Sequence, residues 1–96
     1  MTTLHLIRDS VLINNTITLA LTNLAPDDVI VLLDDGCYNV NQDFIKEIQI
    51  KVPYTQCFAI EPHMRARSLP TTNLNLISYS DLLDLLFNHN NVITWQ

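Results

Sequence analysis

Val29-Ile30-Val31-Leu32-Leu33 is the stretch of this 96-residue chain that decides its fold. It lies between Asp27-Asp28 and Asp34-Asp35-Gly36, and three of its five apolar residues are β-branched. A short apolar run bounded by turn-forming residues is typical of a central strand that is buried on both faces. Because such strands occur in parallel sheets that helices cover, the stretch predicts an α/β fold.

Shorter apolar runs recur on both sides of this stretch and alternate with segments of helical spacing. The alternation predicts one domain over residues 1–96, a small three-layer α/β domain with a mainly parallel sheet flanked by helices. We expect the other strands at residues 4–7, 56–60 and 74–77, with a short edge strand at 92–95. We expect the helices at residues 11–24, 38–48, 61–67 and 82–87.

Several local signals suggest where these elements begin and turn. Asp9 and Ser10 offer capping side chains for the first helix, although its β-branched residues weaken the helical pattern. Ser80 is expected to cap the last helix. Gly36, the only glycine, is expected to adopt a positive φ.

Composition excludes several classes of function. Five basic residues against ten acidic ones give a formal net charge of −5, which disfavours direct nucleic-acid binding. Neither a signal peptide nor a membrane-length apolar run is present, so we expect a cytoplasmic protein with reduced thiols and no membrane partner. No metal-ligand spacing or glycine-rich phosphate loop occurs, so no metal or cofactor is predicted.

The two cysteines suggest different roles. Cys37 follows Gly36 at the start of an expected helix, where a helix dipole could lower its pKa, and it is the one candidate for a persulfide carrier. The favoured interpretation of Cys37 is nevertheless a small, half-buried residue without chemistry, because no basic residue is near it in sequence. Cys57 lies in a strand and is expected to be a core residue.

The remaining candidates are polar or aromatic. Asp34 and Asp35 are expected to form a turn rather than a carboxylate pair, since adjacent residues point in different directions. His5 is expected to be a satisfied core or interface residue. His63, Arg65 and Arg67 form the only basic cluster, and binding of an acidic partner and a solvated helix face remain equally open for it.

Aromatic residues are the candidate anchors of an interface. Tyr38, Tyr79 and Trp95 could bind a partner, because aromatic side chains are enriched in interface cores, or could pack within the domain. The leucines of residues 82–86 are expected to form the buried side of the last helix. In a parallel sheet the ends of the strands meet at one edge, so residues 34–36, 61–63 and 78–80 are expected to lie together.

Five segments together resemble the DsrH/TusB family within the wider DsrE/F/H group. They are Leu4-His5-Leu6-Ile7-Arg8-Asp9-Ser10, Val31-Leu32-Leu33-Asp34-Asp35-Gly36-Cys37-Tyr38, Glu61-Pro62-His63-Met64-Arg65-Ala66-Arg67-Ser68-Leu69, Ser78-Tyr79-Ser80-Asp81-Leu82-Leu83-Asp84-Leu85 and Val92-Ile93-Thr94-Trp95. The matches keep the family's order and spacing over nearly the whole chain.

The resemblance implies a non-catalytic subunit of a cytoplasmic sulfur-relay complex. It implies TusC- and TusD-like sister subunits in a hexamer with two copies of each chain, and a TusE-like sulfur carrier that receives persulfide sulfur. In this TusBCD branch the product is 2-thiouridine at the tRNA wobble position. Two alternatives stay open, namely a sulfurtransferase subunit with Cys37 as its own persulfide carrier and a subunit of a DsrEFH-type sulfur-oxidation complex.

Ala20 bears on the choice between these branches. Some DsrH-type relatives carry a cysteine in the first helix, and the offset from His5 places that position at Ala20. Because alanine cannot carry a persulfide, the resemblance favours the TusB branch.

Overall fold

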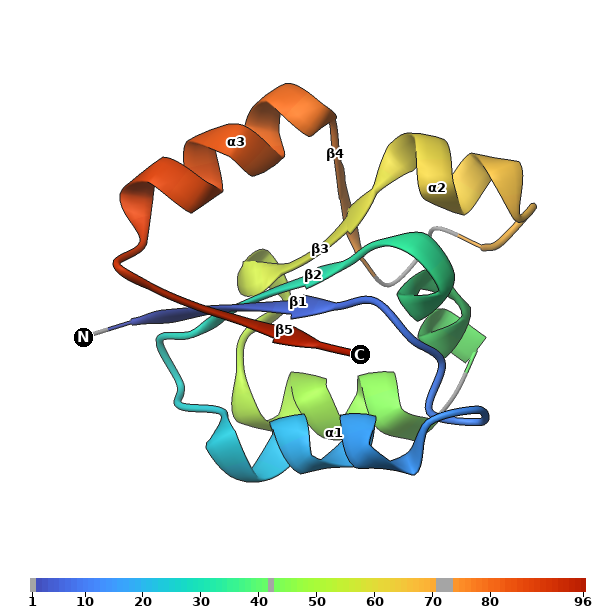
Figure 1. Cartoon of the computed structure of the whole chain (residues 1–96), viewed down its shortest axis with the longest axis horizontal. Coiled ribbons are helices and arrows are strands. Elements are labelled where there is room, and N and C mark those ends of the chain that lie inside the picture. The colour runs from blue at the N-terminus through green and yellow to red at the C-terminus, as the bar shows by residue number, and fades with distance from the viewer. Residues whose placement is uncertain (1, 42, 71–73) are drawn as a thin grey trace.

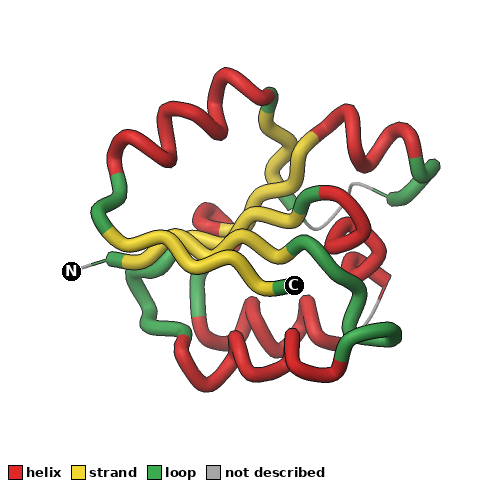
Figure 2. The backbone as a smooth tube through the Cα atoms, viewed as in Figure 1, coloured by secondary structure: helices red, strands yellow, loops and turns green. Residues whose placement is uncertain are grey.

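The computed structural model describes residues 2–41, 43–70 and 74–96, and these form an α/β sandwich around one parallel sheet (Figures 1 and 2). Every pairing within the sheet is parallel, and its strand order is β4-β3-β2-β1-β5. This confirms the predicted fold class and the position of the last strand at an edge. The strands are β1 Thr3–Ile7, β2 Val29–Leu32, β3 Cys57–Ile60, β4 Asn75–Ile77 and β5 Asn91–Trp95.

Helices cover both faces of the sheet. Figure 1 shows α1 and the blue helix η1 below the sheet, with α2 and α3 above it. The bounds of the α-helices are α1 Asp43–Lys51, α2 Glu61–Ala66 and α3 Tyr79–Asn88. The 3-10 helices are η1 Asn15–Asn23, η2 Asp34–Asn41 and η3 Tyr54–Gln56.

The two faces of the sheet are packed unequally. On the lower face, Ile17 and Ala20 of η1 and Ile48 of α1 are buried against the sheet in the larger core cluster. On the upper face, three of the described residues are fully buried in the smaller core cluster, and α3 contributes none of them. The predicted buried side of α3 is therefore confirmed in part: three of its leucines pack half-buried against the sheet, whereas Leu83 is 55% exposed.

The first helix differs from its prediction in type and start. It is a 3-10 helix that begins at Asn15, and Asn14 caps it by accepting a hydrogen bond from the backbone N–H of Thr16 at 3.1 Å. The predicted caps lie earlier, where the carbonyl of Ser10 accepts hydrogen bonds in a turn. Branching at Cβ in Thr16 and its neighbours restricts side-chain rotamers in an α-helix, which is consistent with the departure from regular α geometry.

The helix predicted at residues 38–48 is divided between η2 and α1. Position 42, which separates them, lies outside the described residues. The prediction of a simple turn at residues 34–36 was also incomplete, because these residues form the first turn of η2.

Ser78, and not Ser80, caps α3. The Ser78 hydroxyl accepts from the backbone N–H of Asp81 at 3.2 Å, and the Asp81 carboxylate accepts from the backbone N–H of Ser78 at 3.2 Å. This reciprocal capping box fixes the start of α3 immediately after β4. The sequence signal is ambiguous, because Asp81 lies three residues after Ser78 and directly after Ser80.

Gly36 does not have the predicted positive φ. The positive φ near it belongs to Asp34, at 51°. Glycine is needed at position 36 for lack of space, since a Cβ atom would lie 1.8 Å from the carbonyl oxygen of Ile7. The prediction of a conformational role was therefore wrong, and the close approach of η2 to the end of β1 is the physical reason for glycine.

Candidate functional site

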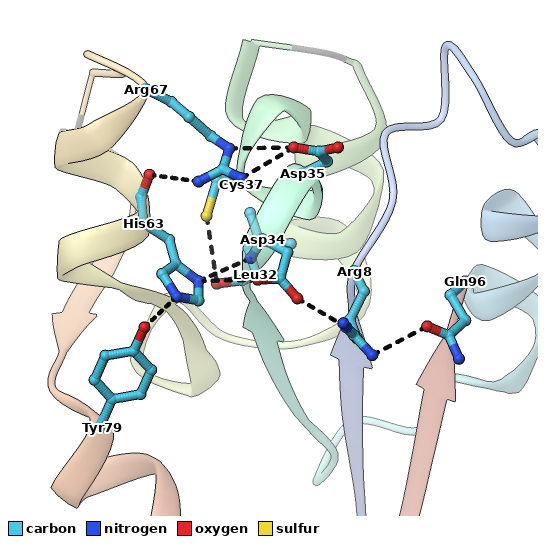
Figure 3. A network of polar contacts seen from close by, with 9 residues as sticks. All are labelled: Arg8, Leu32, Asp34, Asp35, Cys37, His63, Arg67, Tyr79 and Gln96. Atoms are coloured by element: carbon cyan, nitrogen blue, oxygen red, sulfur yellow. Dashed lines mark hydrogen bonds and ion pairs between the residues drawn. The ribbon is translucent and has the colours of Figure 1, made fainter.

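A chain of polar contacts crosses the C-terminal edge of the sheet in the order of the strands (Figure 3). Tyr79 follows β4, His63 follows β3, Asp34 follows β2, Arg8 follows β1 and Gln96 follows β5. Each residue contacts the next along this series. The expectation that residues 34–36, 61–63 and 78–80 meet at one edge is therefore confirmed for Asp34, His63 and Tyr79.

Hydrogen bonds define the orientation of His63. The backbone N–H of Asp34 donates to Nδ1 of His63 at 2.8 Å, so the proton of a neutral imidazole lies on Nε2. That Nε2 contacts the hydroxyl of Tyr79, whose ring meets the imidazole edge-on. The side chain of His63 is only 17% exposed, so it links β2, β3 and α3 rather than projecting into solvent.

Arg8 completes the series on the other side of Asp34. Its Nε donates to the Asp34 carboxylate at 2.8 Å, and its Nη1 donates to the side-chain oxygen of Gln96 at 3.1 Å. Both charged side chains are about two-fifths exposed, so the pair contributes little to stability. It does place a polar, solvent-facing rim along the strand ends.

Arg67 binds the neighbouring carboxylate. Its Nη2 donates to Asp35 at 3.0 Å and its Nη1 donates to the carbonyl of His63 at 3.2 Å, while the guanidinium lies 5.7 Å from the ring centre of Tyr38. Asp34 and Asp35 thus serve different partners, in agreement with the view that they are not a carboxylate pair.

The predicted basic cluster is not an unpaired positive patch. Arg67 pairs with Asp35, and Arg65 donates to Glu61 at 2.8 Å one helical turn away. A shallow pocket lies beside this pair, lined by Glu61, Arg65, Ser68, Leu69 and Leu76. Because the two charges that line it bind each other, the pocket presents no unbalanced charge to a ligand.

Cys37 is fully buried within η2. Burial raises its pKa to about 11, the nearby Asp34 and Asp35 act in the same direction, and Arg67 only partly offsets them. Its sulfur lies 3.7 Å from the carbonyl oxygen of Leu32. A thiol with this pKa is protonated at neutral pH and is a poor nucleophile, so the geometry weighs against a persulfide on Cys37.

Cys57 is a core residue, as predicted. Its side chain is fully buried, and burial raises the pKa of its thiol to about 11. Both cysteines are free thiols.

The prediction that His5 is a satisfied core residue is confirmed, and its unforeseen partners complete a buried polar triad on the lower face. His5 is fully buried, its Nδ1 accepts from Nε1–H of Trp95 at 3.1 Å, and its Nε2 lies 2.9 Å from the carboxylate of Asp28. The sequence could not identify the partners of His5, because Asp28 and Trp95 are far from it along the chain. The one available signal was a histidine within an apolar run. Trp95 is therefore engaged in packing within the domain, whereas Tyr38 and Tyr79 are 42% and 54% exposed.

In the described ranges, no three His, Cys, Asp or Glu side chains are grouped as a metal site. Among the same residues, no helix is long and apolar enough to cross a membrane.

Comparison with known proteins connects this geometry to a family. A family profile described as "DsrH like protein" matches residues 9–92. The chain belongs to this DsrH-like family. Membership supports a sulfur-relay-related subunit that works together with other subunits.

A solved structure resembles the fold of this DsrH-like chain. The solution NMR structure of protein Tm0979 from Thermotoga maritima superposes with a TM-score of 0.62 and 23% sequence identity, over 93% of this chain and 94% of that one. At this identity the likeness establishes the shared fold. A search of curated proteins found no match.

Proposed function

We propose that this chain is a non-catalytic subunit of a cytoplasmic TusBCD-type complex, which passes persulfide sulfur toward 2-thiolation of the tRNA wobble uridine. The family match over residues 9–92 carries the proposal. Its partners would be TusC- and TusD-like subunits, with two copies of each chain, and a TusE-like carrier would take the sulfur from the complex. The chain itself would contact neither nucleic acid nor membrane.

The state of the thiols supports the non-catalytic part of the proposal. A relay cysteine must reach a donor and an acceptor as a thiolate, but Cys37 and Cys57 are both buried with raised pKa values. Ala20, where some relatives carry a cysteine, is buried under the sheet and has no thiol. The reactive sulfur would accordingly be held by a sister subunit.

Exposed apolar residues on α3 support a role within a larger assembly. Phe87 is 85% exposed and Leu83 is 55% exposed, on a helix that buries none of its residues. Apolar side chains that gather on one helix of a small domain are typical of surfaces that a partner covers. We propose α3 as one contact for a sister subunit.

The C-terminal rim of the sheet is the second proposed contact. Five of the residues that the sequence singled out for an interface lie on this rim or on α2 beside it, and Trp95 is excluded because it packs on His5. A rim of paired charges and exposed aromatic side chains suits the edge of a protein–protein interface. Polar contacts there fix how the two proteins align more than how tightly they bind. The five are Tyr38, His63, Arg65, Arg67 and Tyr79.

Co-expression with TusC- and TusD-like subunits tests the proposal. We expect a purified complex with the mass of two copies of each of three chains. A Phe87→Lys variant should lose the sister subunits, because it places a charge in the proposed contact. The matched control Ile50→Lys changes an equally exposed residue on α1 and should retain them. A chain that purifies without either sister subunit would contradict the proposal.

The same complex separates the catalytic alternatives. Sulfur transfer to tRNA should survive Cys37→Ala in this chain, since a sister subunit would carry the persulfide. Loss of transfer with an intact complex would instead identify Cys37 as the carrier. A complex that assembles but never supports tRNA thiolation would favour the sulfur-oxidation branch.

A further inference from the structure

Strand β5 forms an open edge of the sheet. It pairs with β1 on one side only, four of its five residues are exposed, and Figure 1 shows it crossing the front of the molecule with no segment before it. The opposite edge, β4, is shorter and its three residues are half-buried. Of the two edges, β5 is therefore the better template for another strand.

The pairing with β1 determines which backbone groups of β5 point outward. The carbonyl of Trp95 accepts from the N–H of Arg8 at 3.0 Å, so Trp95 directs its backbone toward β1. Backbone groups alternate in direction along a strand, which places the N–H and C=O of Val92 and Thr94 on the side away from β1. In the described part of the chain, no strand pairs with that side.

The charge distribution bears on which kind of partner can pair with β5. The chain carries a formal net charge of −5, yet residues 85–96 contain no Asp, Glu, Lys or Arg. Natural edge strands are usually protected from association by charges or proline, and β5 has neither. The net charges of two copies repel each other, and a segment without charged side chains adds no repulsion of its own where the copies meet.

We propose that a second copy of this chain binds along β5 in antiparallel orientation, so that the two sheets join into one. With Ile93 at the two-fold axis, Val92 of each copy faces Thr94 of the other, and their outward N–H and C=O groups form hydrogen-bonded pairs. The Ile93 side chains, each 38% exposed, then meet across the axis. The match requires only residues of this chain, which favours a second copy over an unrelated strand.

This homotypic contact goes beyond the proposed sulfur-relay function and needs neither a sister subunit nor sulfur. In a hexamer with two copies of this chain, the same contact could join those two copies to each other. The isolated chain can therefore test it, and an answer from that chain is independent of whether a TusBCD-type complex forms.

Light scattering of the isolated chain across a dilution series gives the first test. We expect a species of twice the 11.0 kDa chain mass. Thr94→Pro should shift it to the monomer, because proline removes an outward N–H while the N–H groups that bind β1 remain. A monomeric wild type, or a Thr94→Pro protein that stays dimeric while its circular dichroism is unchanged, would overturn the proposal.

A cross-link tests the register without relying on a disruptive variant. In the proposed pair, position 93 of one copy faces position 93 of the other with the Cα atoms about 4.5 Å apart, within disulfide reach. Ile93→Cys should give a covalent dimer with oxidised glutathione, whereas the more exposed Ile50→Cys should not. Failure of Ile93→Cys to cross-link, or equal cross-linking of both variants, would exclude this register.

Discussion

Nε1–H of Trp95 donates a hydrogen bond to Nδ1 of His5 across 3.1 Å, and this contact joins residues 90 positions apart. The two rings are nearly parallel, with an interplanar angle of 15°. Through His5 the contact continues to Asp28. The three residues tie β5, β1 and the start of β2 together beneath the sheet.

Trp95→Phe should lower the free energy of unfolding by about 1–3 kcal/mol, because the buried Nδ1 of His5 would lose its donor. Denaturation followed by circular dichroism measures the change. Tyr79→Phe removes a hydroxyl at the exposed rim and should cost less. If both variants were equally stable, the buried hydrogen bond would contribute no more than the exposed one.

Asp28→Asn should destabilise the protein at neutral pH by roughly 2–4 kcal/mol, because an amide cannot accept all the donors that converge there. The Asp28 carboxylate accepts from the backbone N–H groups of Ala25 and Thr3, each at 3.0 Å, and lies beside His5. Burial raises its pKa, but these hydrogen bonds outweigh burial and lower the pKa below 3.8. The adjacent and exposed Asp27→Asn serves as the control.

The pH dependence of Asp28 follows from the direction of that shift. A carboxyl whose folded pKa is depressed stabilises the native state above its unfolded pKa, and the contribution disappears as pH falls through the folded value. The stability difference between wild type and Asp28→Asn should therefore be constant near neutral pH and shrink below about pH 3.8. A difference that grows on acidification would contradict the assignment.

Neither thiol should react quickly in the native protein. Cys37 and Cys57 are both buried and have pKa values of about 11, so thiolate is scarce near pH 8. Labelling with a disulfide reagent should be slow for both residues and become complete in denaturant. Selective fast labelling of Cys37 would mean that η2 opens and would revive its candidacy as a carrier.

Gly36→Ala should destabilise the protein by more than about 3 kcal/mol, the upper range for ordinary overpacking. The added Cβ would collide with the backbone carbonyl of Ile7, which cannot turn aside as a flexible side chain could. Thermal unfolding measures the loss. Thr55→Ala, at an exposed position in η3, should leave the melting temperature nearly unchanged.

The spacing of apolar residues along the chain was enough to predict the strands and their arrangement in a parallel sheet. The apolar run at residues 29–33 identified the central strand, of which Val29–Leu32 is in the sheet. Spacing alone also placed residues 34–36, 61–63 and 78–80 at one edge, because parallel strands bring their ends together. The family resemblance was confirmed by the match over residues 9–92.

The remaining features depend on contacts that the sequence does not display. Gly36 is required by the backbone of Ile7, which is distant in sequence. The sequence favoured a half-buried Cys37 without chemistry, whereas its complete burial and raised pKa follow from packing around η2. Leucines at helical spacing in α3 gave no indication that the helix leaves Leu83 and Phe87 uncovered.

The strand order has a consequence for how the chain folds during synthesis. Strand β1 lies between β2 and β5, so one of its two neighbours is made only after the other four described strands. Until Trp95 has left the ribosome, β1 can pair on its β2 side only, and His5 lacks its indole partner. Closing a loop of this length is entropically costly, so completion of the sheet is expected to be a late and comparatively slow step.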